Sequence, residues 1–288
     1  MIKKVKVYQK PDKSDAFTMV LTSPTNVSNT SGFVIDSIDG LGPVKADINT
    51  TNMVVDGNQF NTARIGERDI TLELIFYSES GTGVEDVRQS SYSLFPTKKQ
   101  VYIEVEADNR TVVTKGYVEH NDPEIFSDMC KTQVEIICPD PKMYDADGTE
   151  ITQITAGAST QIEYEGEVEV GGILTIAIAN DISAPVADGE PAFTVSCANP
   201  DGDAQQFDIY TPVGGFAAGD VIIISSIPGD KGCHYIDETE AVINALNLIS
   251  QNPDWIKIKP GINTILITDP NEAIDTVDFE NPICYEGV

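Results

Sequence analysis

The sequence predicts a mainly β protein with two domains. The chain has 288 residues, which exceeds the usual size of one domain. Most of it consists of short runs in which apolar and polar residues alternate, the period of a strand with one buried face. Its 22 glycines and 16 prolines are spread between these runs as turn residues. Short alternating strands joined by tight turns are typical of sandwiches and barrels.

In the first half of the chain, the two-residue period predicts a series of strands. The clearest is DITLELIFY, in which Ile70, Leu72 and Leu74 share one face. Residues 81–96 instead place apolar residues at helical spacing, with Thr82 as a cap, acidic residues in the first turn and a proline at the end. We expect one helix of about three turns there. The expected strands are residues 5–9, 17–22, 32–39, 44–51, 69–77, 100–108, 111–121 and 131–138.

The segment CPDPKMYDADG, residues 138–148, concentrates proline, aspartate and glycine, and we place the domain boundary within it. The domains are then residues 1–142 and 143–288. Residues 1–142 hold 15 Lys or Arg against 21 Asp or Glu, a net charge of −6, whereas residues 143–288 hold 3 against 25, a net charge of −22. This change of surface character supports the boundary.

The second half also reads as a β domain. In residues 161–170 four glutamates alternate with apolar residues, so we expect an acidic strand face that is solvated or meets cations. Residues 239–250 could form a helix, but their β-branched content leaves this open. The expected strands are residues 161–170, 172–180, 192–198, 205–211, 220–226, 254–259 and 263–268.

Charge and composition exclude several classes of function. A net charge of −28 makes the chain a poor binder of nucleic acids and anionic membranes. The longest aliphatic run, residues 221–224, is far too short to span a membrane, and the first residues read as a strand and not as a secretory signal. The five cysteines lack CxxC pairing, which indicates buried, reduced thiols made in a cytosol.

No residue pattern indicates a catalytic or metal site, and we expect neither an enzyme nor a cofactor. The sequence has no phosphate-binding loop, nucleophile elbow or zinc-protease motif. His120 and His234 lie in or beside alternating runs, where a structural role is expected. Asp201, Asp203 and Asp208 offer oxygen ligands but lack the spacing of a calcium loop, so a plain turn is the favoured interpretation.

Several short motifs in the first half resemble one family when taken together. They are an IDGLGP turn at residues 38–43, an RIGERDI stretch at 64–70 leading into the long strand, a helix ending in FPTKK at 95–99, and CPDP at 138–141. Their order and spacing resemble the N-terminal domain of bacteriophage distal tail proteins. The second half is similar in layout to the galectin-like β-sandwich that follows in many of these proteins.

The resemblance implies a β-sandwich or split-barrel domain with one short helix, residues 1–142, followed by a galectin-like sandwich, residues 143–288. It also implies a structural protein of the virion tail, made in the host cytoplasm. Such proteins form a homo-hexameric ring that joins the tail tube to tip or baseplate proteins and the receptor-binding apparatus. DNA would pass through the ring without tight binding.

A ring of this kind closes through head-to-tail contacts between unlike surfaces of neighbouring copies. The charged stretch at the start of the long strand is therefore the candidate assembly interface, with arginine forks able to bind a neighbour's carboxylates. The alternative is ion pairing within the stretch itself. The candidate residues are Arg64, Glu67, Arg68 and Asp69.

Two other classes of function remain open from the sequence. One is a carbohydrate-binding module that recognises the bacterial surface through the second domain, near Trp255 and Tyr210, although the sugar-binding residue set of true galectins is absent. The other is a tail-associated hydrolase, although the carboxylates give almost no signal for one, because chance pairs are unavoidable among 46 acidic residues.

Overall fold

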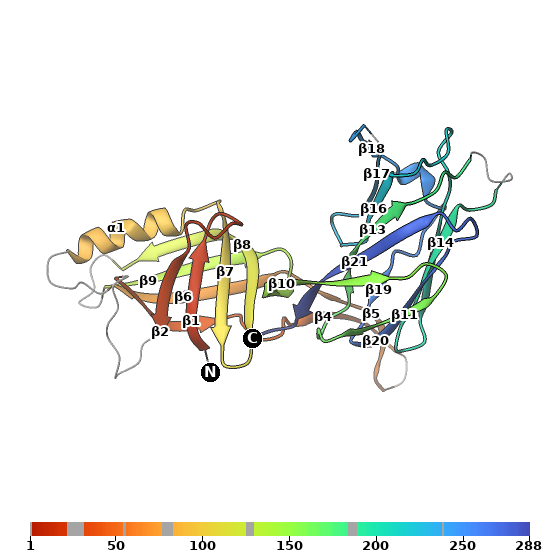
Figure 1. Cartoon of the computed structure of the whole chain (residues 1–288). Coiled ribbons are helices and arrows are strands. Elements are labelled where there is room, and N and C mark those ends of the chain that lie inside the picture. The colour runs from red at the N-terminus through yellow and green to blue at the C-terminus, as the bar shows by residue number, and fades with distance from the viewer. Residues whose placement is uncertain are drawn as a thin grey trace. The chain divides into compact units, whose positions relative to one another are not determined.

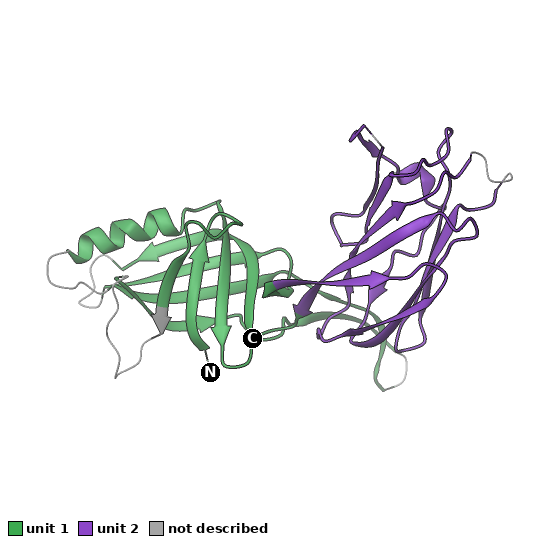
Figure 2. Cartoon of the chain, in the orientation of Figure 1, with its two compact units in different colours: residues 1–147, 285–288 green, residues 148–284 purple. Residues whose placement is uncertain are grey.

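A computed structural model describes residues 2–21, 32–53, 56–76, 83–124, 130–183, 189–237 and 239–288. In these residues the protein is mainly β with a single α-helix, which confirms the predicted fold class (Figure 1). Two compact units divide the chain: unit 1 is residues 1–147 with 285–288, and unit 2 is residues 148–284 (Figure 2).

Unit 1 is built on seven strands, each paired with two neighbours. Their order is β8-β7-β1-β2-β3-β6-β9, and β9 also pairs with β8. All of these pairs are antiparallel except β2 with β3. The strands are β1 (Ile2–Tyr8), β2 (Phe17–Leu21), β3 (Phe33–Asp39), β6 (Arg68–Phe76), β7 (Gln100–Ala107), β8 (Thr111–Pro123) and β9 (Lys131–Cys138).

The core of unit 1 follows from the alternation in the sequence. Ile70, Leu72 and Leu74 of β6 are fully buried, as the period predicts, and they join the alternate valines and isoleucines of β1 and β7 in one apolar cluster. The helix α1 (Val84–Leu94) adds Val87 to this cluster. Gly83 caps α1, and the expected cap Thr82 lies outside the described residues.

Two further strands of unit 1, β4 (Ala46–Asn52) and β5 (Asn58–Ile65), pair only with each other. We call this hairpin the arm. The sequence predicted β4 but not β5, which continues to Ile65, so that only Gly66 and Glu67 separate it from β6. Part of the charged stretch before β6 is therefore strand, in which Arg64 lies opposite Asp47 on a solvated face.

The expected domain boundary differs from the observed units. The proline-rich segment precedes β10 (Met143–Ile154), which pairs with β8 through Tyr144 and Asp145 and then continues into unit 2 without a break. The strand β21 (Ile274–Tyr285) returns the chain to unit 1, to which residues 285–288 belong. Unit 2 is therefore an insertion within unit 1, which a linear reading of composition does not reveal.

Unit 2 is a two-sheet sandwich. The first sheet runs β18-β17-β16-β13-β21-β10 and the second β11-β20-β14-β15. Apolar side chains of both sheets, such as Phe279 and Phe207, line the same small internal void of about 10 Å³. Its strands are β11 (Ser159–Tyr164), β12 (Val170–Gly171), β13 (Ile173–Ile178), β14 (Phe193–Ala198), β15 (Ala204–Ile209), β16 (Val221–Ser225), β17 (Gly232–Ile236), β18 (Val242–Asn244), β19 (Lys257–Ile258) and β20 (Gly261–Thr268).

Residues 239–250, left open as a helix, form β18 and a short 3-10 helix, η1 (Leu246–Leu248). The β-branched Val242 and Ile243 pair with β17, so their strand preference prevails. In the described residues, no helix is long and apolar enough to cross a lipid bilayer.

Candidate assembly site

The arm is amphipathic, although every residue of β5 is exposed. Cross-strand partners share a face, so the register places Ile48 beside Ala63 on one face and Asp47 beside Arg64 on the other. Ile48, Phe60 and Ile65 are 64%, 61% and 53% exposed, a large degree of exposure for apolar side chains. The apolar face of the arm is therefore uncovered in the single chain.

A β-bulge keeps Phe60 on this apolar face. Asn49 pairs with Thr62, but the next residue, Thr50, pairs with Phe60, so Asn61 is an additional residue in β5. If Asn61 were instead paired regularly with Thr50, Phe60 would lie opposite Thr51, on the polar face. The Asn61 side chain donates a hydrogen bond to the Thr51 hydroxyl (2.6 Å), which holds the bulge in place.

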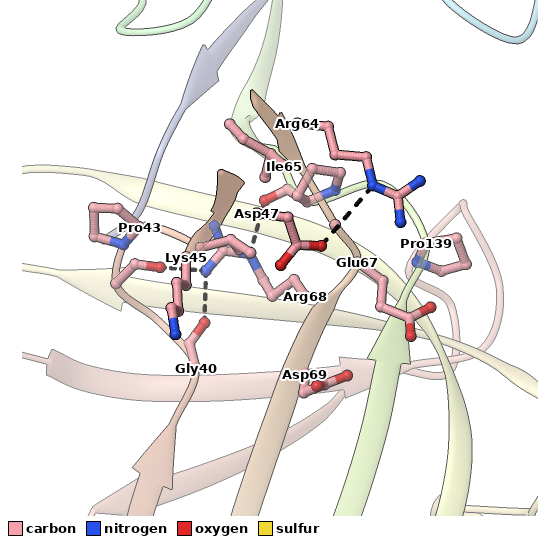
Figure 3. A pocket seen from close by; sticks show the side chains of 14 residues that line it. Gly40, Pro43, Lys45, Asp47, Arg64, Ile65, Glu67, Arg68, Asp69 and Pro139 are labelled. Atoms are coloured by element: carbon pink, nitrogen blue, oxygen red, sulfur yellow. Dashed lines mark hydrogen bonds and ion pairs between the residues drawn. The ribbon is translucent and has the colours of Figure 1, made fainter. Parts of the chain in front are cut away.

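The root of the arm is organised by the buried side chain of Arg68. The chain enters the arm through residues 40–45 and leaves it through Gly66 and Glu67. Arg68 Nη1 donates hydrogen bonds to the carbonyl oxygens of Gly40 and Gly42, both at 2.6 Å (Figure 3). These bonds connect the segment that precedes the arm to Arg68, which lies just after the arm.

The same guanidinium bonds two more distant segments. Its Nε donates to the Pro141 carbonyl (2.8 Å) and its Nη2 to the Glu286 carbonyl (2.6 Å). Arg68 is only 2% exposed, and burial lowers the pKa of its guanidinium. Four carbonyl oxygens take the place of water around this cation, so it is a structural group held by main-chain dipoles.

Gly40 is required where it lies. Its φ is +86°, a conformation that side chains disfavour, and a Cβ atom there would come within 1.9 Å of the Asp69 carbonyl oxygen. The glycine therefore allows the turn to approach β6 closely enough for Arg68 to reach the turn's carbonyls.

The four predicted interface residues separate into two groups. Arg64, Glu67 and Asp69 are exposed and line an open hollow of about 850 Å³ at the root of the arm (Figure 3). Arg64 Nε lies 3.9 Å from Asp47 Oδ2, an exposed pair of small energetic value. The prediction that arginine forks bind a neighbouring copy is wrong for Arg68, because its donors bond carbonyl oxygens of its own chain.

Sequence reasoning missed Ile48, Phe60 and Ile65 as candidate contact residues. They are apolar residues in an otherwise polar stretch, which could have indicated a contact surface. The bulge, however, interrupts the two-residue period, so the sequence alone does not place Phe60 and Ile65 on the same face. The acceptors of Arg68 were also missed, although Gly40, Gly42 and Pro141 belong to the motifs that carry the family resemblance.

The other candidate residues of unit 2 have ordinary structural surroundings. Lys259 Nζ lies 2.6 Å from Asp201 and 3.1 Å from Asp203, so both carboxylates of that loop already have an ammonium partner. Within the described residues, no group of three or more His, Cys, Asp or Glu could hold a metal ion. Lys231 lies over the ring of Trp255, 5.6 Å from its centroid.

The structure also shows the surroundings of the predicted acidic strand and of the five cysteines. The expected acidic strand is shorter than predicted: β11 ends at Tyr164, so only Glu163 of the four glutamates lies in it, and residues 165–169 are not a strand. All four glutamates are exposed, and Lys257 Nζ pairs with Glu169 at 2.8 Å. The five cysteines form no disulfide, as predicted, and four of them are buried, whereas Cys130 is partly exposed. Burial raises the pKa of the Cys138, Cys197 and Cys233 thiols to about 11, which makes them poor nucleophiles.

Comparison with known proteins finds one family that matches most of unit 1 and the beginning of unit 2. Residues 22–157 match the sequence model of a family described as the phage tail protein RIFT-related domain. No curated protein matches the chain with significance.

Solved structures share the fold over nearly the whole chain. The Dit protein of phage SPP1, described as a paradigm of the hub adsorption apparatus in phages that infect Gram-positive bacteria, is 14% identical, with a TM-score of 0.65 over 88% of this chain and 94% of that one. A chain of the phage P2 baseplate in its activated conformation with Ca is 11% identical, with a TM-score of 0.50 over 100% of both chains. The corresponding baseplate structure with Sr gives 11% and 0.51 over 99% of both chains.

Residues 22–157 thus carry a phage tail protein domain, which indicates a component of the virion tail, and the chain shares its fold with the Dit protein of phage SPP1. The resemblance drawn from the sequence motifs is confirmed by these two findings.

Proposed function

We propose that this chain is the hub of the tail tip, a hexameric ring that joins the tail tube to tip or baseplate proteins and the receptor-binding apparatus. The observation that carries the proposal is the arm. A two-stranded hairpin with one apolar face is marginally stable alone in water, so it gains most by packing against another chain.

The closure of a ring requires unlike surfaces on the two sides of each copy. The arm projects one such surface, and the hollow at its root, lined by Arg64, Glu67 and Asp69, is concave. In this proposal the apolar face of the arm contacts the adjacent copy, and the three exposed charges fix the register of the contact. Charged groups at the rim of an interface contribute more to orientation than to affinity.

The proposed role is structural and needs no catalytic activity. The net charge of −28 also fits a ring through which DNA passes without being held, because clustered cations are what bind phosphates tightly. The proposed partners are five further copies of the chain, the tail tube protein and the proteins of the tip.

Light scattering after size exclusion tests the ring. The single chain has a mass of 31.2 kDa, so a hexamer has about 187 kDa. The measurement needs moderate salt, since like charges on six copies repel one another. We expect the hexamer mass for the wild type and a monomer for Phe60→Ser, because a buried aromatic anchor is typically worth more than 2 kcal/mol at an interface, roughly a 30-fold change in affinity.

A matched control is Val213→Ser, which replaces an apolar residue of unit 2 that is fully exposed. This variant is expected to assemble like the wild type. A monomeric wild type, or a Phe60→Ser variant that still forms the hexamer, would contradict the proposed use of the arm.

A further inference from the structure

The last four residues of the chain are bound at the root of the arm. The Val288 amide donates a hydrogen bond to the Leu41 carbonyl (3.0 Å), and the Glu286 carbonyl accepts one from Arg68 Nη2 (2.6 Å). Gly287 is buried between them, where a Cβ atom would lie 2.7 Å from the Leu41 oxygen. We call residues 285–288 the tail segment.

The tail segment is also held at its beginning. The Tyr285 hydroxyl donates to Asp145 Oδ2 (3.2 Å), and the Arg110 guanidinium lies over the Tyr285 ring, 4.5 Å from its centroid. Tyr285 and Val288 pack against the apolar core of unit 1. The segment is therefore fixed at both ends, with its backbone directed at Arg68 and at the turn that enters the arm.

Arg68 couples these contacts because it is one rigid planar group. A guanidinium is a fixed fork, so its position is set by all of its acceptors together. Loss of the Glu286 carbonyl would leave a charged donor unpaired in the interior, and such a donor must be rehydrated or must move. Either response disturbs the bonds from Nη1 to Gly40 and Gly42, which hold the two ends of the arm together.

We propose that Arg68 and the tail segment act as a positioning device for the arm: docking of residues 285–288 fixes the root of the arm in the orientation that assembly requires. The device links the last residues of the chain, which follow unit 2, to the hairpin at residues 46–65. Its effect on assembly rests on the proposed ring, whereas its effect on the arm does not.

Limited digestion with trypsin tests the coupling directly. The chain carries its own cleavage sites at the root of the arm, after Lys45 and after Arg64, and an exposed reference site after Lys231 in unit 2. Proteolysis reports the population of locally open states, so the ratio of root cleavage to reference cleavage measures how firmly the root is held.

Two variants release the tail segment without altering Arg68 or the arm. Gly287→Val introduces a side chain where no Cβ fits, and a chain lacking residues 286–288 removes the acceptor with no new atoms. Gly214→Val is the matched control, because nothing lies within 4 Å of a Cβ there. We expect root cleavage to rise about tenfold relative to the Lys231 site in both variants and to stay unchanged in the control.

The outcomes separate the two proposals. A raised cleavage ratio together with a smaller hexamer fraction supports the positioning device and its role in assembly. If the cleavage ratio is raised in both variants but the wild-type chain itself never forms a hexamer, the positioning device is supported and the ring proposal fails. An unchanged ratio in both tail variants would overturn the device, whatever the oligomeric state.

Discussion

At the scale of single residues, Glu104 of β7 shows how a buried charge contributes to the stability of unit 1. The side chain is 4% exposed, and both Lys6 and Lys13 contact its carboxylate, the latter at 2.8 Å. Burial alone would raise the pKa of Glu104, but the bonds from the two lysines outweigh it and hold the pKa below its ordinary value of 4.5. The unfolded chain therefore binds a proton more readily at this position than the folded chain.

The lowered pKa of Glu104 in the folded state determines how the stability of the protein depends on pH. The stabilisation from Glu104 is fully present above the ordinary carboxyl pKa and is lost as the pH falls through the lower pKa of the folded state. We expect Glu104→Gln to lower the free energy of unfolding by about 1 to 2 kcal/mol at pH 7, since both lysines stay partly hydrated. The difference from the wild type should shrink below about pH 4, as measured by urea unfolding at several pH values.

A suitable control is Glu106→Gln on the same strand. Glu106 pairs with Lys4 at 2.6 Å, but its side chain is 30% exposed and its charge is screened by solvent, so the expected loss is much smaller than that for Glu104→Gln. Equal losses for the two variants at pH 7 would show that burial of Glu104 adds nothing.

Residue-scale predictions from sequence succeeded where the cause is local. The buried parity of Ile70, Leu72 and Leu74 follows from the pleat alone. The surroundings of Arg68 do not, because its acceptors lie 26 to 218 residues away in sequence and are carbonyl oxygens that every residue possesses. Charge at a strand's start is compatible with an exposed interface and with a buried anchor, and only the fold distinguishes them.

At the scale of elements, the bulge in the arm is the least predictable feature with the clearest consequence. Deletion of Asn61 would make the pairing regular and leave Phe60 opposite Thr50, on the face that carries Ile48. We expect the shortened arm to keep its strand pairing and its continuous apolar face, and the hexamer fraction measured by light scattering to stay close to that of the wild type, in contrast to Phe60→Ser. The length-preserving control Asn61→Ser should also assemble normally, so a loss of the hexamer on deletion alone would show that assembly needs the bulge itself and not only the apolar face.

At the scale of the whole molecule, the two-domain layout was predictable and its connectivity was not. Composition and charge change near residue 142, and each half alternates like a β domain, which is sufficient to expect two units. The return of residues 285–288 to unit 1 depends on β21 running back beside β10, and no local pattern encodes a pairing over such a distance.

The insertion of unit 2 allows it to be removed. Asp145 and Tyr285 lie within hydrogen-bonding distance, so a short Gly/Ser linker in place of residues 148–284 can join the two ends while the tail segment stays in position. Unit 1 keeps its own apolar core, and we expect the shortened chain to fold and to form six-membered assemblies through the arm. An unfolded product would show that unit 1 needs unit 2, and a folded monomer would show that assembly needs it.

The full chain and the chain without unit 2 can also be compared to test how the acidic charge affects assembly. Residues 148–284 hold 22 Asp or Glu and 3 Lys, a net charge of −19, so the removal of unit 2 leaves −9 of the original −28. Repulsion between copies should dominate the salt dependence of the full chain, because the screening length falls from about 30 Å at 0.01 M to about 8 Å at 0.15 M ionic strength. We expect the hexamer fraction of the full chain to rise steeply over this range and that of the shortened chain to change little. Equal salt dependence would place the controlling charges in unit 1, where Arg64, Glu67 and Asp69 are the first candidates.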